Sequence, residues 1–126
     1  MKIRVENGLP IVSIKIKYKD KEVTLNNVLL DTGSSNTIFD TDVVQTVGIL
    51  IDPINGKARR MYGVGGESEL CYEQKAKDLR IDSYHLKDFS IQLGITRETY
   101  GFDGILGLDF FLYKKLIIDF NNLQAN

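Results

Sequence analysis

The residues with the clearest chemical potential in this chain follow a short apolar run. Asp31 comes directly after Val28-Leu29-Leu30 and is followed by Thr32, Gly33 and Ser34. The apolar run suits a strand buried on both faces, and small hydroxylated residues with glycine are typical of a turn. Such a turn would hold the Asp31 carboxylate at the end of a buried strand, where it could act as an acid or a base. The plainest alternative is a turn that only joins two strands.

Two glycine-rich segments occur further along the chain. Gly63-Val64-Gly65-Gly66 lies between two segments with strand character, 57–62 and 68–74, and this pattern predicts a hairpin with a glycine tip. Gly104-Ile105-Leu106-Gly107 precedes a short apolar segment, 108–113, that we expect to form a helix. The glycines of the hairpin permit the backbone conformations that a mobile lid requires, although an ordinary tight hairpin has the same composition.

Together these three motifs resemble the retropepsin-like aspartic proteases, which comprise the retroviral-type enzymes and their cellular and bacterial relatives. Asp31-Thr32-Gly33 matches the catalytic triplet of that family, and Gly63-Val64-Gly65-Gly66 stands where the family has its flap. The segment Asp103-Gly104-Ile105-Leu106-Gly107-Leu108 is similar to the loop-to-helix segment of the non-viral members. Three motifs in the right order favour this interpretation over a turn without function.

The resemblance implies a role for each residue of the first motif. Asp31 would be catalytic, Thr32 would join the two active-site loops across a dimer axis, and Gly33 would let a backbone amide approach the carboxylate. Threonine can both donate and accept, and glycine has no side chain to block that approach. Ser34 replaces the alanine of the viral members, and its hydroxyl could hydrogen-bond the outer carboxylate oxygen, which would favour the charged form.

The resemblance also implies which residues contact a substrate. The flap would comprise Met61, Tyr62 and residues 63–66, with Tyr62 and Val64 facing the substrate or the partner. An extended peptide would lie between the flap and the floor of the site, paired through main-chain hydrogen bonds, with alternate side chains in pockets. The candidate pocket walls are Ile54, Met61, Val64 and Ile105.

One carboxylate cannot be both base and acid in the same step of peptide hydrolysis, so a second aspartate is required. Asp40-Thr41-Asp42 and Asp82-Ser83-Tyr84 lack the glycine of the first motif, and Asp103-Gly104 belongs to the other family segment. We therefore expect a two-fold homodimer in which Asp31 of each subunit contributes to one site. The two carboxylates would share one proton, as aspartic proteases in general illustrate. The sequence thus predicts an aspartic endopeptidase that activates water.

The elements that would position this site are mostly short strands. Alternating apolar and polar residues indicate strands at 14–19 and 89–93, each with one face toward water. A single mainly β domain over residues 1–126 follows, and the family implies a closed β-barrel with one or two short helices, completed as a two-fold homodimer. We further expect turns at Asp20-Lys21 and Asn26-Asn27, a short helix capped by Asp40 and stopped by Gly48, and strands at 49–51 and 116–120 before a polar tail.

Composition and charge exclude several classes of function. The 126 residues, 43% of them hydrophobic, suffice for one core without metal or disulfide, and a net charge of −1 with scattered Lys and Arg argues against nucleic-acid binding. We see no signal peptide and no apolar run of membrane-spanning length, so we expect a cytoplasmic protein. His85 and Cys71 are the only residues of their types, which leaves a metal hydrolase without ligands, and we expect no cofactor. A non-catalytic peptide-binding or dimerisation module on the same fold stays as the alternative, and the intact Asp31-Thr32-Gly33 argues against it.

Overall fold

The computed structural model describes residues 1–62 and 65–126, and this part of the chain is mainly β. Short helices are placed between the strands at three points, where one or two were expected. In chain order the elements are β1 (Ile3–Glu6), β2 (Leu9–Tyr18), β3 (Lys21–Leu30), β4 (Ile38–Asp40), α1 (Thr41–Gln45), β5 (Lys57–Tyr62), β6 (Ser68–Ile81), β7 (Tyr84–Gly94), α2 (Thr96–Tyr100), β8 (Gly104–Leu106), α3 (Leu108–Lys114), β9 (Ile118–Asp119) and β10 (Gln124–Ala125).

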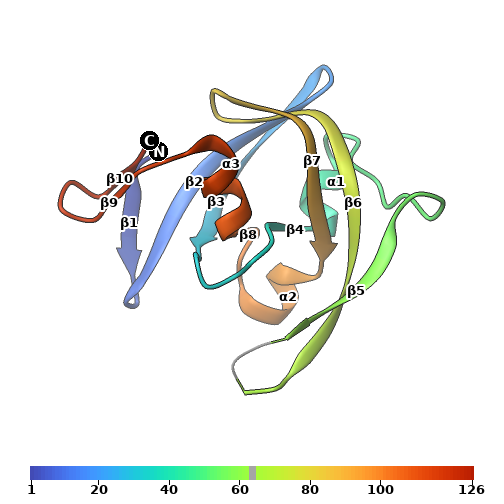
Figure 1. Cartoon of the computed structure of the whole chain (residues 1–126), viewed down its shortest axis with the longest axis horizontal. Helices are drawn as coiled ribbons and strands as arrows, with labels where there is room; N and C mark the ends of the chain where they lie inside the picture. Colours follow the sequence, from blue (N-terminus) through green and yellow to red (C-terminus); the bar gives the residue numbers. More distant parts are fainter. Residues whose placement is uncertain (63–64) are drawn as a thin grey trace.

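The main sheet closes on itself. Its eight strands follow the order β1-β2-β3-β8-β4-β7-β6-β5, and an additional pairing between β2 and β6 completes a ring (Figure 1). The β5–β6 hairpin extends beyond this ring, and β9 and β10 form a small separate sheet beside the N-terminal strand. The mainly β single domain predicted from the alternating pattern is therefore confirmed.

The interior of the ring is filled by the apolar half of each alternating strand. Ile14 and Ile16 of β2 are 1% and 0% exposed, and Leu25 of β3 and Ile91 of β7 are both fully buried. α3 closes one end, where Phe110 is fully buried against this core. These buried side chains explain why apolar residues recur at every second position of the strands, because alternate positions of a strand face opposite sides of a sheet.

The chain crosses itself near the end of β3. β8 lies between β3 and β4, parallel to β3 and antiparallel to β4, so the residues between β3 and β4 pass around its end. This crossing needs close backbone contact: a Cβ at Gly104 would lie 2.9 Å from Ile38 O and 2.9 Å from the Phe39 ring. A side chain at Gly104 would clash with β4, so close packing explains why a glycine is needed there.

Two expectations about local structure are wrong. Asn26-Asn27 makes no turn and lies inside β3, where the Asn27 side chain donates to Gly101 O at 2.5 Å. Residues 49–51 form no strand, because Gly48 turns the chain at φ +89° and the Ile49 amide then bonds back to Val44 O. At Asn27 the side chain bonds to a residue distant in sequence, and at Ile49 the backbone amide bonds to the end of α1. Neither group is then available for the turn or the strand that the local sequence predicted.

The C-terminal strand is shorter than expected, and the tail is ordered. Only Ile118–Asp119 of the expected 116–120 strand is extended, and it pairs with Gln124–Ala125 of what we expected to be a polar tail. Ala125 is fully buried in the core. No helix in the described part of the chain has the length and apolar character needed to cross a membrane.

Candidate active site

Asp31 follows the last residue of β3, and backbone amides fix its turn. The Asp31 amide donates to Leu106 O of β8 at 2.9 Å, which holds the residue against the neighbouring strand. The Gly33 amide donates to Asp31 Oδ1 at 2.9 Å, and the Ser34 amide donates to Asp31 O at 3.1 Å. A Cβ at Gly33 would lie 3.1 Å from the same carboxylate oxygen. The turn therefore orients the carboxylate, and glycine allows the close approach.

The two hydroxyl residues of the motif behave differently. Thr32 is exposed in the single chain. Ser34 donates its hydroxyl to Asn36 O at 3.0 Å. The expected bond from Ser34 to the Asp31 carboxylate is therefore wrong for this structure. The single hydroxyl proton of Ser34 is already donated to Asn36 O.

The second glycine-bounded segment supports this turn from below. The Leu108 amide donates to Ser34 O at 2.8 Å. A Cβ at Gly107 would lie 2.6 Å from the Asn36 carbonyl and 2.9 Å from Ser34 O, so any larger residue would push the two segments apart. The glycine at this position lets the start of α3 pack directly against the turn that carries Asp31.

Thr37 and Asp109 are two site-supporting residues that the sequence analysis missed. Thr37 is fully buried, and its hydroxyl donates to Asp109 Oδ1 at 2.8 Å while accepting from the Gly107 amide at 3.0 Å. The Thr37 amide donates to Asp109 Oδ2 at 3.1 Å. The one available signal was Asp109, an acidic residue in the first turn of the predicted helix. Such a residue usually only interacts favourably with the helix dipole.

A pocket of about 350 Å³ opens beside the turn, lined by Asp31, Gly33 and Ser34. Asp31 is the only carboxylate on its lining in the described part of the chain. The other walls are apolar or aromatic, and they are Leu29, Met61, Tyr62, Tyr100, Phe102 and Ile105. The site is therefore a single carboxylate beside a mostly apolar cavity.

Two of the expected pocket walls line this cavity, and one does not. Met61 and Ile105 are on its lining, and both pack in a small apolar cluster with Ile38 and Cys71. Ile54 is absent from the lining and is 88% exposed in the loop before β5, so its assignment was wrong. Its loop is closed instead by bonds from the Ile54 and Asn55 amides to Asp52 Oδ1, which point the side chain outward.

The β5–β6 hairpin reaches the pocket through the end of β5. Tyr62 pairs with Ser68 and is 74% exposed, and it also lines the cavity. Gly65 and Gly66 are exposed, and Gly66 has φ +83°, a conformation that glycine adopts without strain. Gly63 and Val64 lie outside the described residues, so their expected flap positions stay predictions.

Tyr100 and Phe102 reach the pocket from α2 and the residues after it, and the sequence analysis predicted neither. Burial, together with the nearby Glu69 carboxylate of β6, raises the pKa of Tyr100 above its usual value. The phenol hydroxyl of Tyr100 can act as a hydrogen-bond donor. Glu69 belongs to β6, so its effect on Tyr100 places the end of α2 near the β5–β6 hairpin.

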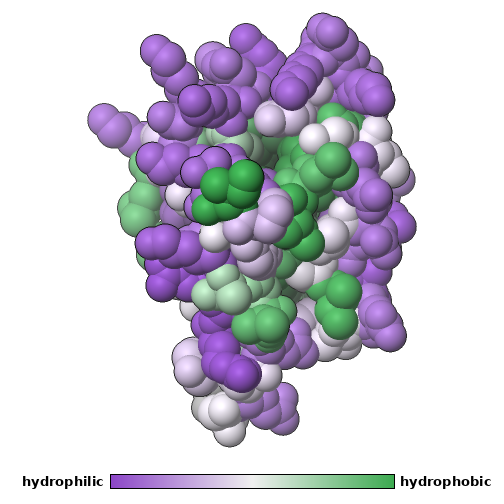
Figure 2. Space-filling model, turned by 90° about the vertical axis from the view of Figure 1, so that its right-hand side faces the viewer, coloured by the Kyte–Doolittle hydropathy of each residue, from purple (hydrophilic) through white to green (hydrophobic). Residues whose placement is uncertain are grey.

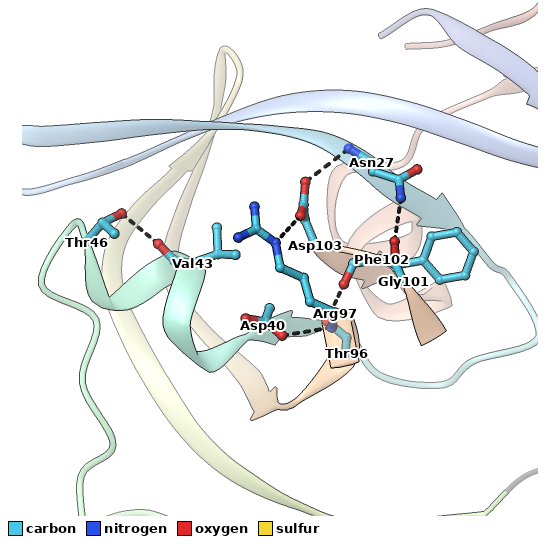
Figure 3. Close-up of polar contacts among 9 residues, drawn as sticks. All are labelled: Asn27, Asp40, Val43, Thr46, Thr96, Arg97, Gly101, Phe102 and Asp103. Carbon is cyan, nitrogen blue, oxygen red and sulfur yellow. Dashed lines mark hydrogen bonds and ion pairs between the residues drawn. The ribbon is translucent and has the colours of Figure 1, made fainter. Parts of the chain in front are cut away.

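A partly buried polar network holds α2 in place (Figure 3). The Asp103 carboxylate accepts from the Asn27 amide at 3.1 Å and from Arg97 Nε at 2.6 Å, and this bond raises the pKa of Arg97. The Arg97 amide donates to Asp40 Oδ1 at 2.8 Å. Asp40 stands at the N-cap position of α1, but its carboxylate makes no cap bond because it is used here. The network joins β3, β4 and α2 around Phe102.

His85 lies on the surface. Its Nε2 is 3.0 Å from Asp78 Oδ1, and the Asp78 side chain is 75% exposed. Within residues 1–62 and 65–126, no three His, Cys, Asp or Glu side chains are grouped as a metal ion would require.

The comparison with known proteins gives the family. The model of the aspartyl protease family matches residues 12–110, a span that includes Asp31, the β5–β6 hairpin and the Gly104–Gly107 segment. The chain belongs to the aspartyl protease family. A search among curated proteins gave no match.

Solved structures of other proteins share the fold of this aspartyl protease. A retropepsin-like aspartic protease from Rickettsia conorii superposes with a TM-score of 0.66 at 17% identity, covering 98% of this chain and 86% of that one. The retroviral protease-like domain of Ddi1 from Leishmania major gives a TM-score of 0.56 at 14% identity, covering 92% and 85%. The predicted retropepsin-like fold is thereby confirmed, and the roles of single residues rest on the geometry described above.

Proposed function

We propose that this aspartyl protease is an endopeptidase whose catalytic dyad forms from Asp31 of two identical subunits. The observation that carries the proposal is the placement of Asp31: it is oriented by the Gly33 amide at the opening of a mostly apolar pocket that no second carboxylate lines among the described residues. Thr32, beside it, is exposed. A two-fold axis next to this turn would bring the symmetry-related Asp31 alongside the first.

The dyad would act by general acid–base catalysis. One carboxylate takes a proton from a bound water as the water oxygen attacks the scissile carbonyl carbon, and the other donates a proton to the carbonyl oxygen. The tetrahedral intermediate then breaks the carbon–nitrogen bond as a proton moves to the leaving amine. Two carboxylates this close hold a single proton between them, so they titrate as a pair.

The peptide would lie in the space between the β5–β6 hairpin and the floor formed by β8. Main-chain hydrogen bonds to the hairpin would fix its direction, and a side chain next to the scissile bond would enter the cavity beside Asp31. Met61, Phe102 and Ile105 on the lining favour an apolar side chain at that position. Tyr62 and residues 63–66 would close over the bound peptide as a flap.

The test is cleavage of a proteome-derived peptide library by the native protein and by Asp31→Asn. We expect many new peptide ends with the native protein and none above background with the variant, since Asn cannot exchange the proton. The half-buried Asp31 lies outside the core, so circular dichroism should show the same fold for both. Cleavage by the variant at the native rate would refute the assignment, and binding without cleavage by the native protein would favour the non-catalytic module.

A further inference from the structure

Cations that are scattered along the sequence gather in one groove of the folded chain. The groove has a volume of about 770 Å³. Lys17 and Lys19 line it from the end of β2, and Lys75, Lys77 and Arg80 line it from β6. All five residues are exposed. We call this surface the cationic groove, and none of its lining residues also lines the Asp31 pocket.

The cationic groove opens where two paired strands separate. β2 pairs with β6 at Ile16 with Ile81 and at Lys17 with Arg80, and then continues into its turn with β3. This turn and the β6–β7 turn lie at the top of Figure 1. Figure 2 shows the right-hand side of that view, with hydrophilic residues across its upper end and apolar residues gathered across its middle. The groove is therefore on the part of β6 that is remote from the tip of the β5–β6 hairpin.

The two carboxylates on the lining, Asp52 and Asp78, do not neutralise the cations. Asp52 Oδ1 accepts from the Ile54 and Asn55 amides, and Asp78 Oδ1 is 3.0 Å from His85 Nε2. Among the described residues, none of the five cations is in an ion pair. Five cations and two carboxylates leave a local excess of three positive charges, in a chain whose net charge is −1.

Two of the cations repel each other across the paired strands. Lys17 of β2 is directly opposite Arg80 of β6, and like charges at such positions destabilise a sheet. Glu22 of β3 is opposite Lys17 on its other side, and Asp88 of β7 is opposite Lys77. Neither of these carboxylates lines the groove. An anion bound in the groove would relieve the repulsion, so the groove suits an anionic partner.

The lining favours a peptide with spaced carboxylates over a strand of nucleic acid. Nucleic acid carries a phosphate at every nucleotide, and its unpaired bases stack on aromatic side chains. Both ring side chains of the described lining already have partners: Lys19 Nζ is 5.4 Å from the centroid of the Tyr18 ring, and His85 contacts Asp78. Asp52 and Asp78 would repel a continuous row of phosphates. A peptide can place its carboxylates beside the lysines and its neutral residues beside these aspartates.

We propose that the cationic groove is a docking site for an acidic segment of the protein substrate, remote from the bond that is cleaved. The inference rests on the proposed function, because it assigns this segment to the chain that is hydrolysed. β6 connects the two regions: Ser68 pairs with Tyr62 beside the Asp31 pocket, and Lys75 lies further along the same strand. The separation of Ser68 and Lys75 is on the order of 23 Å at about 3.3 Å per residue, which an extended peptide spans. Two contacts made by one peptide raise its affinity above that of either contact alone.

The first test is binding of a fluorescent peptide of eight glutamates, measured by anisotropy on Asp31→Asn so that catalysis plays no part. We expect binding that weakens with added salt, because salt screens exposed charges. Lys17→Glu and Lys77→Glu, each added to Asp31→Asn, should raise Kd about fivefold or more. Lys57→Glu makes the same charge change at an exposed position of β5 outside the groove, and it should leave Kd unchanged. Thermal unfolding checks the fold of each variant, and if one groove variant does not fold, the other decides.

The second test asks whether the docked segment belongs to the substrate. A peptide that the native protein cleaves is extended through a flexible linker by eight glutamates, or by eight glutamines as the neutral reference. The glutamate extension should lower KM and leave kcat unchanged, because a contact remote from the reacting bond stabilises the ground state and the transition state equally. Lys77→Glu should abolish this difference in KM and leave the kinetics of the glutamine-extended peptide unchanged.

Several results would overturn the inference and leave the proposed function intact. If the glutamate peptide does not bind, or binds both groove variants as tightly as Lys57→Glu, the groove is not a site for acidic peptides. If an oligouridylate of eight nucleotides binds the groove and the glutamate peptide does not, the partner is a nucleic acid. Equal KM values for the two extended peptides would show that the docked segment is not part of the substrate. If the native protein cleaves no peptide at all, the proposed function fails, and the substrate role of the groove fails with it.

Discussion

At the scale of single residues, the Asp31 carboxylate is positioned by main-chain groups. The Gly33 amide donates to Oδ1, and the Ser34 hydroxyl that could have taken part is bonded to Asn36 O instead. The space beside Oδ1 is narrow, since a Cβ on Gly33 would approach within 3.1 Å. The position of the Asp31 carboxylate therefore depends on the absence of a side chain at residue 33.

Gly33→Ala should reduce activity much more than it reduces stability. The added methyl group would press on Asp31 Oδ1 and displace the carboxylate, and a displacement of about 1 Å of a catalytic group costs on the order of 100-fold in rate. We expect kcat/KM for a cleaved peptide to fall about 10- to 100-fold, with the thermal midpoint little changed. Ser35→Ala, at an exposed position in the same turn, is the control and should keep native activity. Equal activity of the two variants would refute this account of Gly33.

Inhibitors should distinguish the chemistry at the site. A statine-type compound, whose hydroxyl mimics the tetrahedral intermediate, should inhibit cleavage. Metal chelators and serine reagents should have no effect, and thiol reagents should have none because Cys71 is only 4% exposed. Inhibition constants and residual activities measure each of these. Loss of activity with a chelator, restored by added metal, would contradict the aspartic mechanism.

At the scale of elements, the sequence was sufficient where the relevant contacts are local. The alternation over 14–19 predicts its strand because the two faces of that strand meet different environments. The apolar segment 108–113 predicts α3 for a similar reason. The motif at Asp31 was recognisable because its residues are contiguous.

Long-range contacts set the limit of that prediction. Asn26-Asn27 has the composition of a turn, but it lies within β3, where Asn27 bonds to Gly101 and Asp103, more than 70 residues away. α2 has too little apolar periodicity to be seen, so Tyr100 and Phe102 could not be assigned to the pocket. Polar residues that bond across the fold look like loop residues in a linear sequence.

Asp103→Ala should destabilise the fold through the network around α2. The change would leave the Asn27 amide without its partner and release Arg97, and leaving a partly buried amide unsatisfied costs about 1–3 kcal/mol. Urea denaturation measures the free energy of unfolding. The matched control is Asp88→Ala, at an exposed position of β7, and we expect nearly native stability for it. An equally small effect of Asp103→Ala would mean that the network does not hold α2 in place.

At the scale of the whole molecule, the proposed mechanism needs a second carboxylate that the pocket of one chain does not supply among the described residues. The closed sheet, the crossing at β8 and the start of α3 fix one carboxylate at the molecular surface, beside an exposed Thr32 and an apolar groove. No second carboxylate of the described residues lines the pocket. If the second group comes from another copy, activity must depend on association, and specific activity should fall on dilution below the dissociation constant of the dimer.

The most direct measurement of the central claim is the activity of a mixture of native and Asp31→Asn chains after verified subunit exchange. At equal amounts and with random pairing, about half of the native chains are in heterodimers that hold one carboxylate and cannot supply both acid and base. The account predicts that activity falls to about half of that given by the same amount of native chains alone. Full retention of activity would show that one chain suffices, and it would contradict the shared Asp31 dyad.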